Sequence, residues 1–81
     1  MPKVKDSADN EAALGKLGSA IRAHRHRVNM SQEALADAAK VNRTHMGEVE
    51  RGKRNVSILV LFRIAQAMNV TPSEMLASAG L

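Results

Sequence analysis

Residues 42–55 read NRTHMGEVERGKRN and bring together three side chains with different hydrogen-bonding chemistry. Arg43 offers a fork of donors that matches the O6 and N7 acceptors of guanine in the major groove of DNA. Thr44 offers a methyl group for thymine and a hydroxyl that donates or accepts. Glu48 offers an acceptor for the N4 amino group of cytosine. These residue types indicate a surface that reads base edges.

The same segment has the apolar spacing of a helix packed on a core, because Met46 and Val49 stand three residues apart. At 100° per residue, Met46, Val49 and Glu50 fall on one side of such a helix, while Thr44 and Glu48 fall on the other. The pattern predicts a helix whose inner face packs against the core and whose outer face is available to DNA.

Two of these assignments have competing interpretations from the residues alone. For Arg43 the alternative is a contact with a phosphate, although its fork of donors favours a guanine. Glu48 is as well explained by a surface ion pair with Arg51 or Lys53, because a carboxylate is tolerated in a groove lined by phosphates only when it is well paired. Both alternatives remain open at the level of sequence.

Phosphate contacts are expected from the start of the preceding helix and from the basic loop that follows. Gln32 opens a predicted helix, where the free backbone N–H groups and the positive end of the helix dipole suit an anion. His45 has an equally good alternative as a partly buried ring. The expected phosphate-binding residues are Gln32, His45, Arg51, Lys53, Arg54 and Asn55.

The distribution of charge also favours a polyanionic partner. The net charge is +4 in 81 residues. The segment from Arg22 to Arg54 holds eight of the basic and four of the acidic residues, so all of the excess lies in the middle of the chain. A solvated, arginine-rich surface is the alternative. With no cysteine, no apolar signal-peptide region and no run long enough for a membrane span, we expect a cytoplasmic protein without a membrane partner.

Helical periodicity runs through most of the chain. The first predicted helix covers about residues 10–28, and others begin near residues 32, 43, 58 and 72. Each of the last four is preceded by a residue that caps helices well: Ser31, Asn42, Ser57 and Thr71. The sequence therefore predicts an all-α, five-helix domain over residues 10–81, preceded by a flexible tail at residues 1–9.

Two short helices joined by about three residues, the second of them basic, form the pattern of a helix-turn-helix. The segments SQEALADAA, NRTHMGEVERGKRN and LFRIAQAMNVTPSEML together resemble the lambda-repressor-like family, also called Cro/C1 or XRE. Within that family, RTHMGEVERGKRN looks closest to the restriction-modification controller proteins. The resemblance implies a transcriptional regulator that binds double-stranded DNA with its third helix in the major groove.

The resemblance also assigns roles to individual residues. Arg43, Thr44 and Glu48 match the base-reading positions of the family. Arg25 and Glu50 match an arginine and a glutamate that form a structural ion pair in these repressors. The chain departs from the family pattern in the turn, where Lys40 replaces a glycine that tends to be left-handed.

The last two predicted helices carry more apolar surface than a small core needs, which usually marks an interface. We expect a homodimer that reads a palindromic operator, through an interface made of Leu59, Val60, Phe62, Met75 and Leu76. The alternative function is an antitoxin-like interaction module, in which this surface masks a partner protein and DNA binding is secondary.

The sequence gives no support to a catalytic, cofactor or metal function. No nucleophile, base and orienting group converge, and no second domain offers a pocket for a small-molecule effector. His24 and His26 lie about 200° apart on a helix and are unable to chelate one ion.

Overall fold

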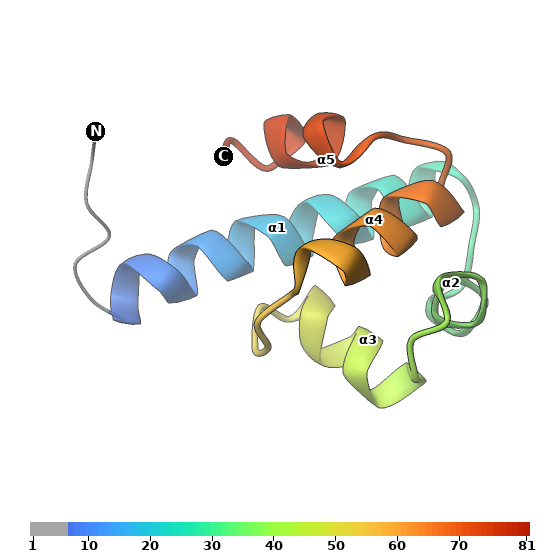
Figure 1. Cartoon of the computed structure of the whole chain (residues 1–81), viewed down its shortest axis with the longest axis horizontal. Helices are drawn as coiled ribbons and strands as arrows, with labels where there is room; N and C mark the ends of the chain where they lie inside the picture. The colour runs from blue at the N-terminus through green and yellow to red at the C-terminus, as the bar shows by residue number, and fades with distance from the viewer. Residues whose placement is uncertain (1–6) are drawn as a thin grey trace.

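The computed structural model describes residues 7–81, and its elements are all α-helices (Figure 1). No strand occurs in this part of the chain. The all-α, five-helix prediction is confirmed, with bounds α1 Ser7–Arg27, α2 Gln32–Ala39, α3 Arg43–Glu50, α4 Ile58–Ala67 and α5 Pro72–Ser78.

The first helix begins earlier than the sequence predicted. Ser7 to Asp9, assigned to a flexible tail, form the first turn of α1, so that assignment was wrong for these residues. Asp9 is an acidic residue in the first turn, where the positive end of the helix dipole favours it. The prediction of a flexible tail at residues 1–6 lies outside the described residues.

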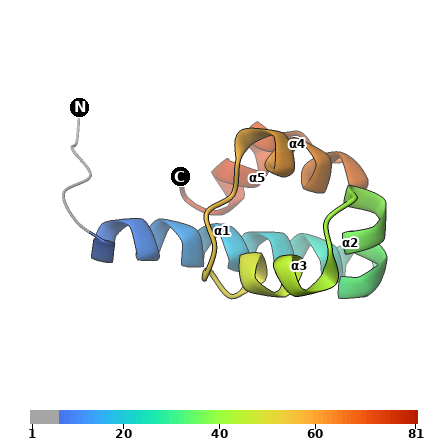
Figure 2. The ribbon, with the colours of Figure 1, turned by 60° about the horizontal axis from the view of Figure 1, so that its bottom comes forward.

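The helices pack around the long α1. One side of α1 contacts α3, another contacts α5, and α2 and α4 pack on each other to close the domain. In Figure 2, α3 runs alongside α1 while α4 and α5 lie above them. The core gathers the fully buried side chains of all five helices, the largest being Ile21, Leu35, Met46, Val49, Ile64, Met68 and Met75. None of the helices described is long and apolar enough to cross a membrane.

The four predicted helix starts are present and share one mechanism. Ser31, Asn42, Ser57 and Thr71 have extended backbones, and each side-chain oxygen accepts a hydrogen bond from a backbone N–H three residues later. At α5 the cap is reciprocal. The N–H and hydroxyl of Thr71 donate to the carboxylate of Glu74, which holds the pKa of Glu74 below its usual range.

The turn between α2 and α3 keeps the left-handed residue that the family pattern implied. Lys40 has φ 58° and ψ 45°, although a lysine there costs on the order of 1 kcal/mol. The next residue compensates in part, because the N–H of Val41 donates to the carbonyl of Ala36 at 2.9 Å and closes the end of α2. The angle between α2 and α3 is thus fixed without a glycine.

Two glycines of α1 meet the C-terminal end of α3 in different ways. A Cβ atom built on Gly18 would lie 2.6 Å from the carbonyl oxygens of Val49 and Glu50, so only glycine allows this approach. A Cβ atom on Gly15 would have no neighbour within 4 Å. Gly15 does receive a contact, however, because its backbone supports the loop residue Gly52.

Gly15→Ala and Gly18→Ala are therefore expected to change stability in opposite directions. Alanine at position 15 should stabilise the domain by about 0.5–1 kcal/mol through helix propensity. Alanine at position 18 should destabilise it by about 1–3 kcal/mol, since the backbones must separate. Urea unfolding followed by circular dichroism measures both. Equal shifts in the two variants would contradict the close contact at Gly18.

The C-terminal helices correct one prediction about an apolar residue. Met75, expected in a dimer interface, is fully buried in the core because the inner side of α5 packs on α1 and α4. Ile58 is 60% exposed because it occupies the first position of α4, ahead of the buried stripe that starts at Leu61. His24 of α1 is buried and shares a 3.0 Å hydrogen bond with Ser78.

Candidate nucleic-acid interface

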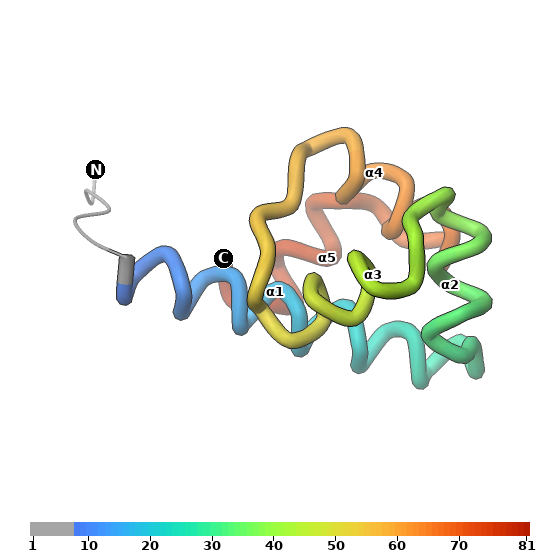
Figure 3. The backbone as a smooth tube through the Cα atoms, turned by 90° about the horizontal axis from the view of Figure 1, so that it is seen from below, coloured from blue at the N-terminus to red at the C-terminus, as the bar shows by residue number. Residues whose placement is uncertain are grey.

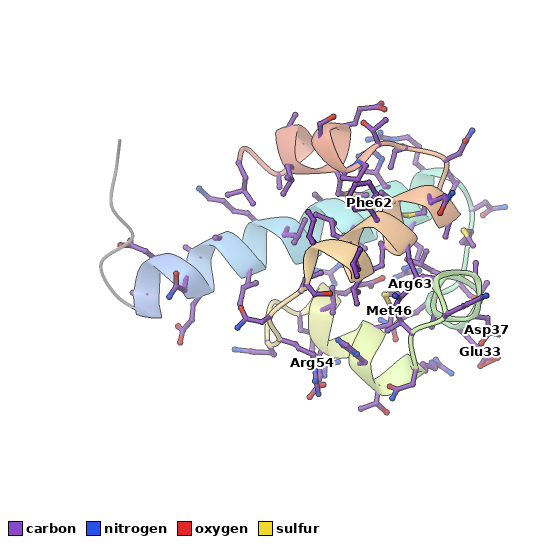
Figure 4. The ribbon with its side chains drawn as sticks, in the orientation of Figure 1. Glu33, Asp37, Met46, Arg54, Phe62 and Arg63 are labelled. Atoms are coloured by element: carbon purple, nitrogen blue, oxygen red, sulfur yellow. The ribbon has the colours of Figure 1, made fainter. Side chains whose placement is uncertain are left out.

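The third helix has the two faces that the sequence predicted. Met46 and Val49 are almost completely buried, and Figure 4 shows Met46 in the region enclosed by α2, α3 and α4. Arg43 and Thr44 are exposed, and Glu48 is partly exposed. Figure 3 shows α3 and α2 on the outside of the bundle, next to each other. The outer edge of α3 is thus open to a large ligand.

The back of α3 is held by a buried ion pair. The Nε and Nη2 atoms of Arg25 donate to the two carboxylate oxygens of Glu50 at 2.8 and 3.0 Å. The Nη1 atom of Arg25 donates to the carbonyl of Met30, and the amide of Gln32 adds a 3.2 Å bond to Glu50. The predicted pair is present, and it ties α1, the start of α2 and α3 together.

Gln32 was expected to contact phosphate, and its side chain has a different partner. Its amide nitrogen donates to Glu50 and therefore faces the fold. The N-terminus of α2 still lies beside α3. A hollow of about 340 Å³ opens there, and it is lined by Gln32, Arg43, Thr44, Gly47 and Arg51. Two arginines around an open hollow at a helix N-terminus form a surface that suits a phosphate group.

Arg43 is engaged by an acidic residue of the neighbouring helix. Its Nη1 atom donates to Glu33 of α2 at 3.1 Å, and both side chains are more than 60% exposed. An exposed pair of this kind contributes about 0–1 kcal/mol, so Arg43 is able to exchange Glu33 for another acceptor. Figure 4 shows Glu33 on the outer side of α2.

Glu48 is also paired, but its partner is neither Arg51 nor Lys53, the two that the sequence suggested. The Nε and Nη2 atoms of Arg54 both approach the Oε1 atom of Glu48, at 2.9 and 2.8 Å. Arg54 lies in the loop after α3, and its side chain reaches back to lie beside that helix (Figure 4). No acidic residue of the described chain forms an ion pair with Arg51 or Lys53.

Apart from Gln32, the residues expected to bind phosphate divide into two groups in the structure. Arg51, Lys53, Arg54 and Asn55 are exposed on one side of the molecule, after the end of α3. His45 differs: its side chain is half buried and its Nε2 atom is enclosed, with no hydrogen-bond partner among the described residues. The Nε2 atom thus faces inward from the third position of α3, which favours the alternative of a partly buried ring over a phosphate contact through this nitrogen.

The partners of Arg43 and Glu48, the two charged residues on the outer face, were not predicted from the sequence. Arg54 was expected to bind phosphate, and no role at this surface was predicted for Glu33. The pair of Arg43 with Glu33 depends on how α2 and α3 cross, and the pair of Glu48 with Arg54 depends on the path of the loop. Neither feature can be recognised from residues that are close together in the sequence. Among residues 7–81, no three His, Cys, Asp or Glu side chains gather in a way that could hold a metal ion.

Known proteins match both the chain and its fold. The pattern of the helix-turn-helix family matches residues 21–75. The chain is 38% identical over 65 residues to the control protein C.SmaI of Serratia marcescens, an alignment that covers 80% of this chain and 77% of that protein.

Solved structures of helix-turn-helix regulators have the same fold as this chain. The restriction-modification controller protein C.AhdI from Aeromonas hydrophila superposes with a TM-score of 0.75 and 39% identity, over 76% of this chain and 94% of that one. The clp gene regulator ClgR from Corynebacterium glutamicum superposes with a TM-score of 0.82 and 28% identity, over 84% of this chain and 72% of that one.

Proposed function

Because this chain belongs to the helix-turn-helix family of DNA-binding transcriptional regulators, we propose that it binds a two-fold symmetric operator as a homodimer, with α3 of each protomer in the major groove. Its likeness to C.SmaI and C.AhdI supports a regulator of the restriction-modification controller type. Arg43, Thr44 and Glu48 read base edges in this proposal, and the basic loop after α3 contacts phosphates.

The observation that carries the proposal is the division of α3 into two faces. Met46 and Val49 anchor the helix from behind, and the buried Glu50 adds a bond to α1. The opposite edge presents Arg43 and Thr44 to solvent. A rigidly held helix with an open polar edge is what a major groove about 12 Å wide can admit.

The dimer is supported by apolar side chains that the monomer leaves in water. Leu59 and Phe62 of α4 are 66% and 52% exposed, and Ile58 stands beside them in the sequence. Val60 and Leu76, also expected in the interface, are half buried against the core. Phe62 borders a hollow of about 310 Å³ that includes Pro72. Exposed apolar groups next to a hollow suit a self-complementary, two-fold contact.

Leu59→Asp is therefore expected to convert the dimer into a monomer and to weaken operator binding by at least tenfold, because a charge would be buried at the centre of the contact. Sedimentation velocity at tens of micromolar measures the first effect. Ala8→Asp, which adds the same charge at the exposed start of α1, is the matched control. A wild-type protein that sediments only as a monomer would contradict the dimer.

Selection from a random pool of duplex DNA tests the whole proposal. We expect a consensus with two-fold symmetry and half-sites whose centres are about 34 Å apart, one turn of DNA. The affinity should fall steeply with salt, because phosphate contacts release counterions. Failure to enrich any sequence, with binding that depends only on salt, would contradict a regulator with a specific operator.

A further inference from the structure

The ion pair between Glu48 and Arg54 has a geometry that leaves part of the carboxylate open. Both donor atoms of Arg54, Nε and Nη2, meet the Oε1 atom of Glu48. The hydrogen bonds that hold this carboxylate within residues 7–81 therefore all end on one oxygen, and Oε2 is left to face other groups. A carboxylate needs one such oxygen to accept a hydrogen bond from the N4 amino group of cytosine.

We propose that Arg54 is a positioning residue that orients and neutralises Glu48, so that the pair together selects cytosine at one position of each half-site. This inference rests on the proposed function of α3, and it gives Arg54 a role other than the phosphate contact expected from the sequence. Specificity at that position is then set by a loop residue as well as by the recognition helix.

Electrostatics gives the reason why Glu48 needs such a partner. The outer face of α3 would lie between two rows of phosphates, and a lone carboxylate brought there would be repelled by every DNA sequence. The guanidinium of Arg54 removes the net charge of the carboxylate before DNA arrives. The neutral pair is then hardly repelled by the phosphates as DNA approaches. The hydrogen bond to cytosine therefore increases the affinity and does not merely offset a repulsion.

The two exposed ion pairs on this face differ in how easily they open. Arg43 meets Glu33 through one nitrogen at 3.1 Å, and both side chains are more than 60% exposed. Glu48 receives two nitrogens of Arg54 and is only 31% exposed. Arg43 is thus placed to leave its partner for a guanine, whereas Glu48 and Arg54 are placed to stay together in the complex.

The loop that carries Arg54 is fixed in position by backbone contacts. The N–H of Gly52 donates to Val49, and the N–H of Lys53 donates to the carbonyl of Glu48 at 2.8 Å, which closes α3 in the manner of a Schellman motif. Gly52 has φ 70°, and a Cβ atom there would lie 2.7 Å from the Cα of Gly15. The loop therefore packs directly on α1, and the backbone position from which the side chain of Arg54 extends is fixed.

The experiment measures relative affinities for every single-base variant of the selected operator. It compares the wild-type dimer with Glu48→Gln, Arg54→Gln and the double variant. Lys53→Gln is the matched control, because it removes one charge from the adjacent loop position, which has no ion pair in the described chain. Thermal unfolding checks that each variant is folded, which is expected because all three side chains lie at least partly in solvent.

We expect Glu48→Gln to abolish a preference for cytosine at one position per half-site, and this identifies the position that Glu48 reads. Arg54→Gln should reduce the preference at that same position by roughly tenfold and leave the other positions unchanged. In the double variant, the loss of Arg54 should add nothing further at that position. Lys53→Gln should weaken binding to all sequences by a similar factor.

Three outcomes would overturn the inference, and they separate it from the proposed function. If Arg54→Gln weakens all sequences uniformly, as Lys53→Gln does, Arg54 is a phosphate ligand only. If Glu48→Gln changes no position, Glu48 reads no base. In both cases the operator and the role of α3 stand. If the wild-type protein selects no sequence at all, the proposed function fails together with this inference.

Discussion

Arg43→Ala is expected to lower affinity for the selected operator by about 1–3 kcal/mol per half-site, and thus by about 2–6 kcal/mol for a dimer. The loss follows from the bidentate contact that Arg43 makes with guanine in our proposal. Arg43 must give up its ion pair with Glu33 to bind guanine, but this costs little binding free energy because both side chains are largely exposed. Titration of labelled operator DNA, followed by fluorescence anisotropy at fixed salt, measures this effect.

Sequence dependence distinguishes base reading by Arg43 from a phosphate contact. In Arg43→Ala, operators with a substituted guanine should bind as well as the original operator, while the wild-type protein should discriminate between them. Lys16→Ala is the matched control, since Lys16 is exposed on the side of α1 that borders the end of α5. A uniform loss for all DNA sequences would assign Arg43 to a phosphate.

The largest effect on stability is expected from breaking the buried ion pair. Arg25→Met leaves the carboxylate of Glu50, which is only 3% exposed, without its charged partner, and should destabilise the domain by about 3–5 kcal/mol. Urea unfolding followed by circular dichroism gives the free energy. Arg22→Met, on an exposed position of the same helix, is the control and should change stability by less than about 0.5 kcal/mol.

A double variant tests the reason for this loss. Arg25→Met combined with Glu50→Leu removes both buried charges and should recover a large part of the stability, since an apolar pair of similar volume often replaces a buried ion pair without loss. Failure of the double variant to recover would show that the pair acts mainly through the bonds of Arg25 to Met30 and its packing on α1.

The helices themselves could be predicted from the sequence because their signals are local. The four caps, from Ser31 to Thr71, each depend on a side chain and a backbone group three residues apart. The inner face of α3 follows in the same way from the spacing of Met46 and Val49. The start of α1 was placed too late because residues 7–9 carry no large apolar side chain, and the lack of one does not separate a tail from a solvated first turn of a helix.

Burial and pairing at the surface could not be predicted to the same degree, because they depend on how distant segments meet. Met75 is buried because α5 folds back against α1, and nothing in the sequence around it distinguishes this from an interface position. The pairing of Glu48 with Arg54 depends on a loop that rests on Gly15. The partner of Glu50 was predicted correctly only through the family resemblance.

The central claim is that the outer edge of α3 enters the major groove, and methylation interference tests it most directly. Methylation of guanine N7 blocks the major-groove acceptor that Arg43 would use. We predict that methylation of one guanine per half-site prevents binding of the wild-type protein and has no further effect on Arg43→Ala. If the same guanines interfere equally in both proteins, or only minor-groove methylation of adenine N3 interferes, α3 does not read the major groove through Arg43.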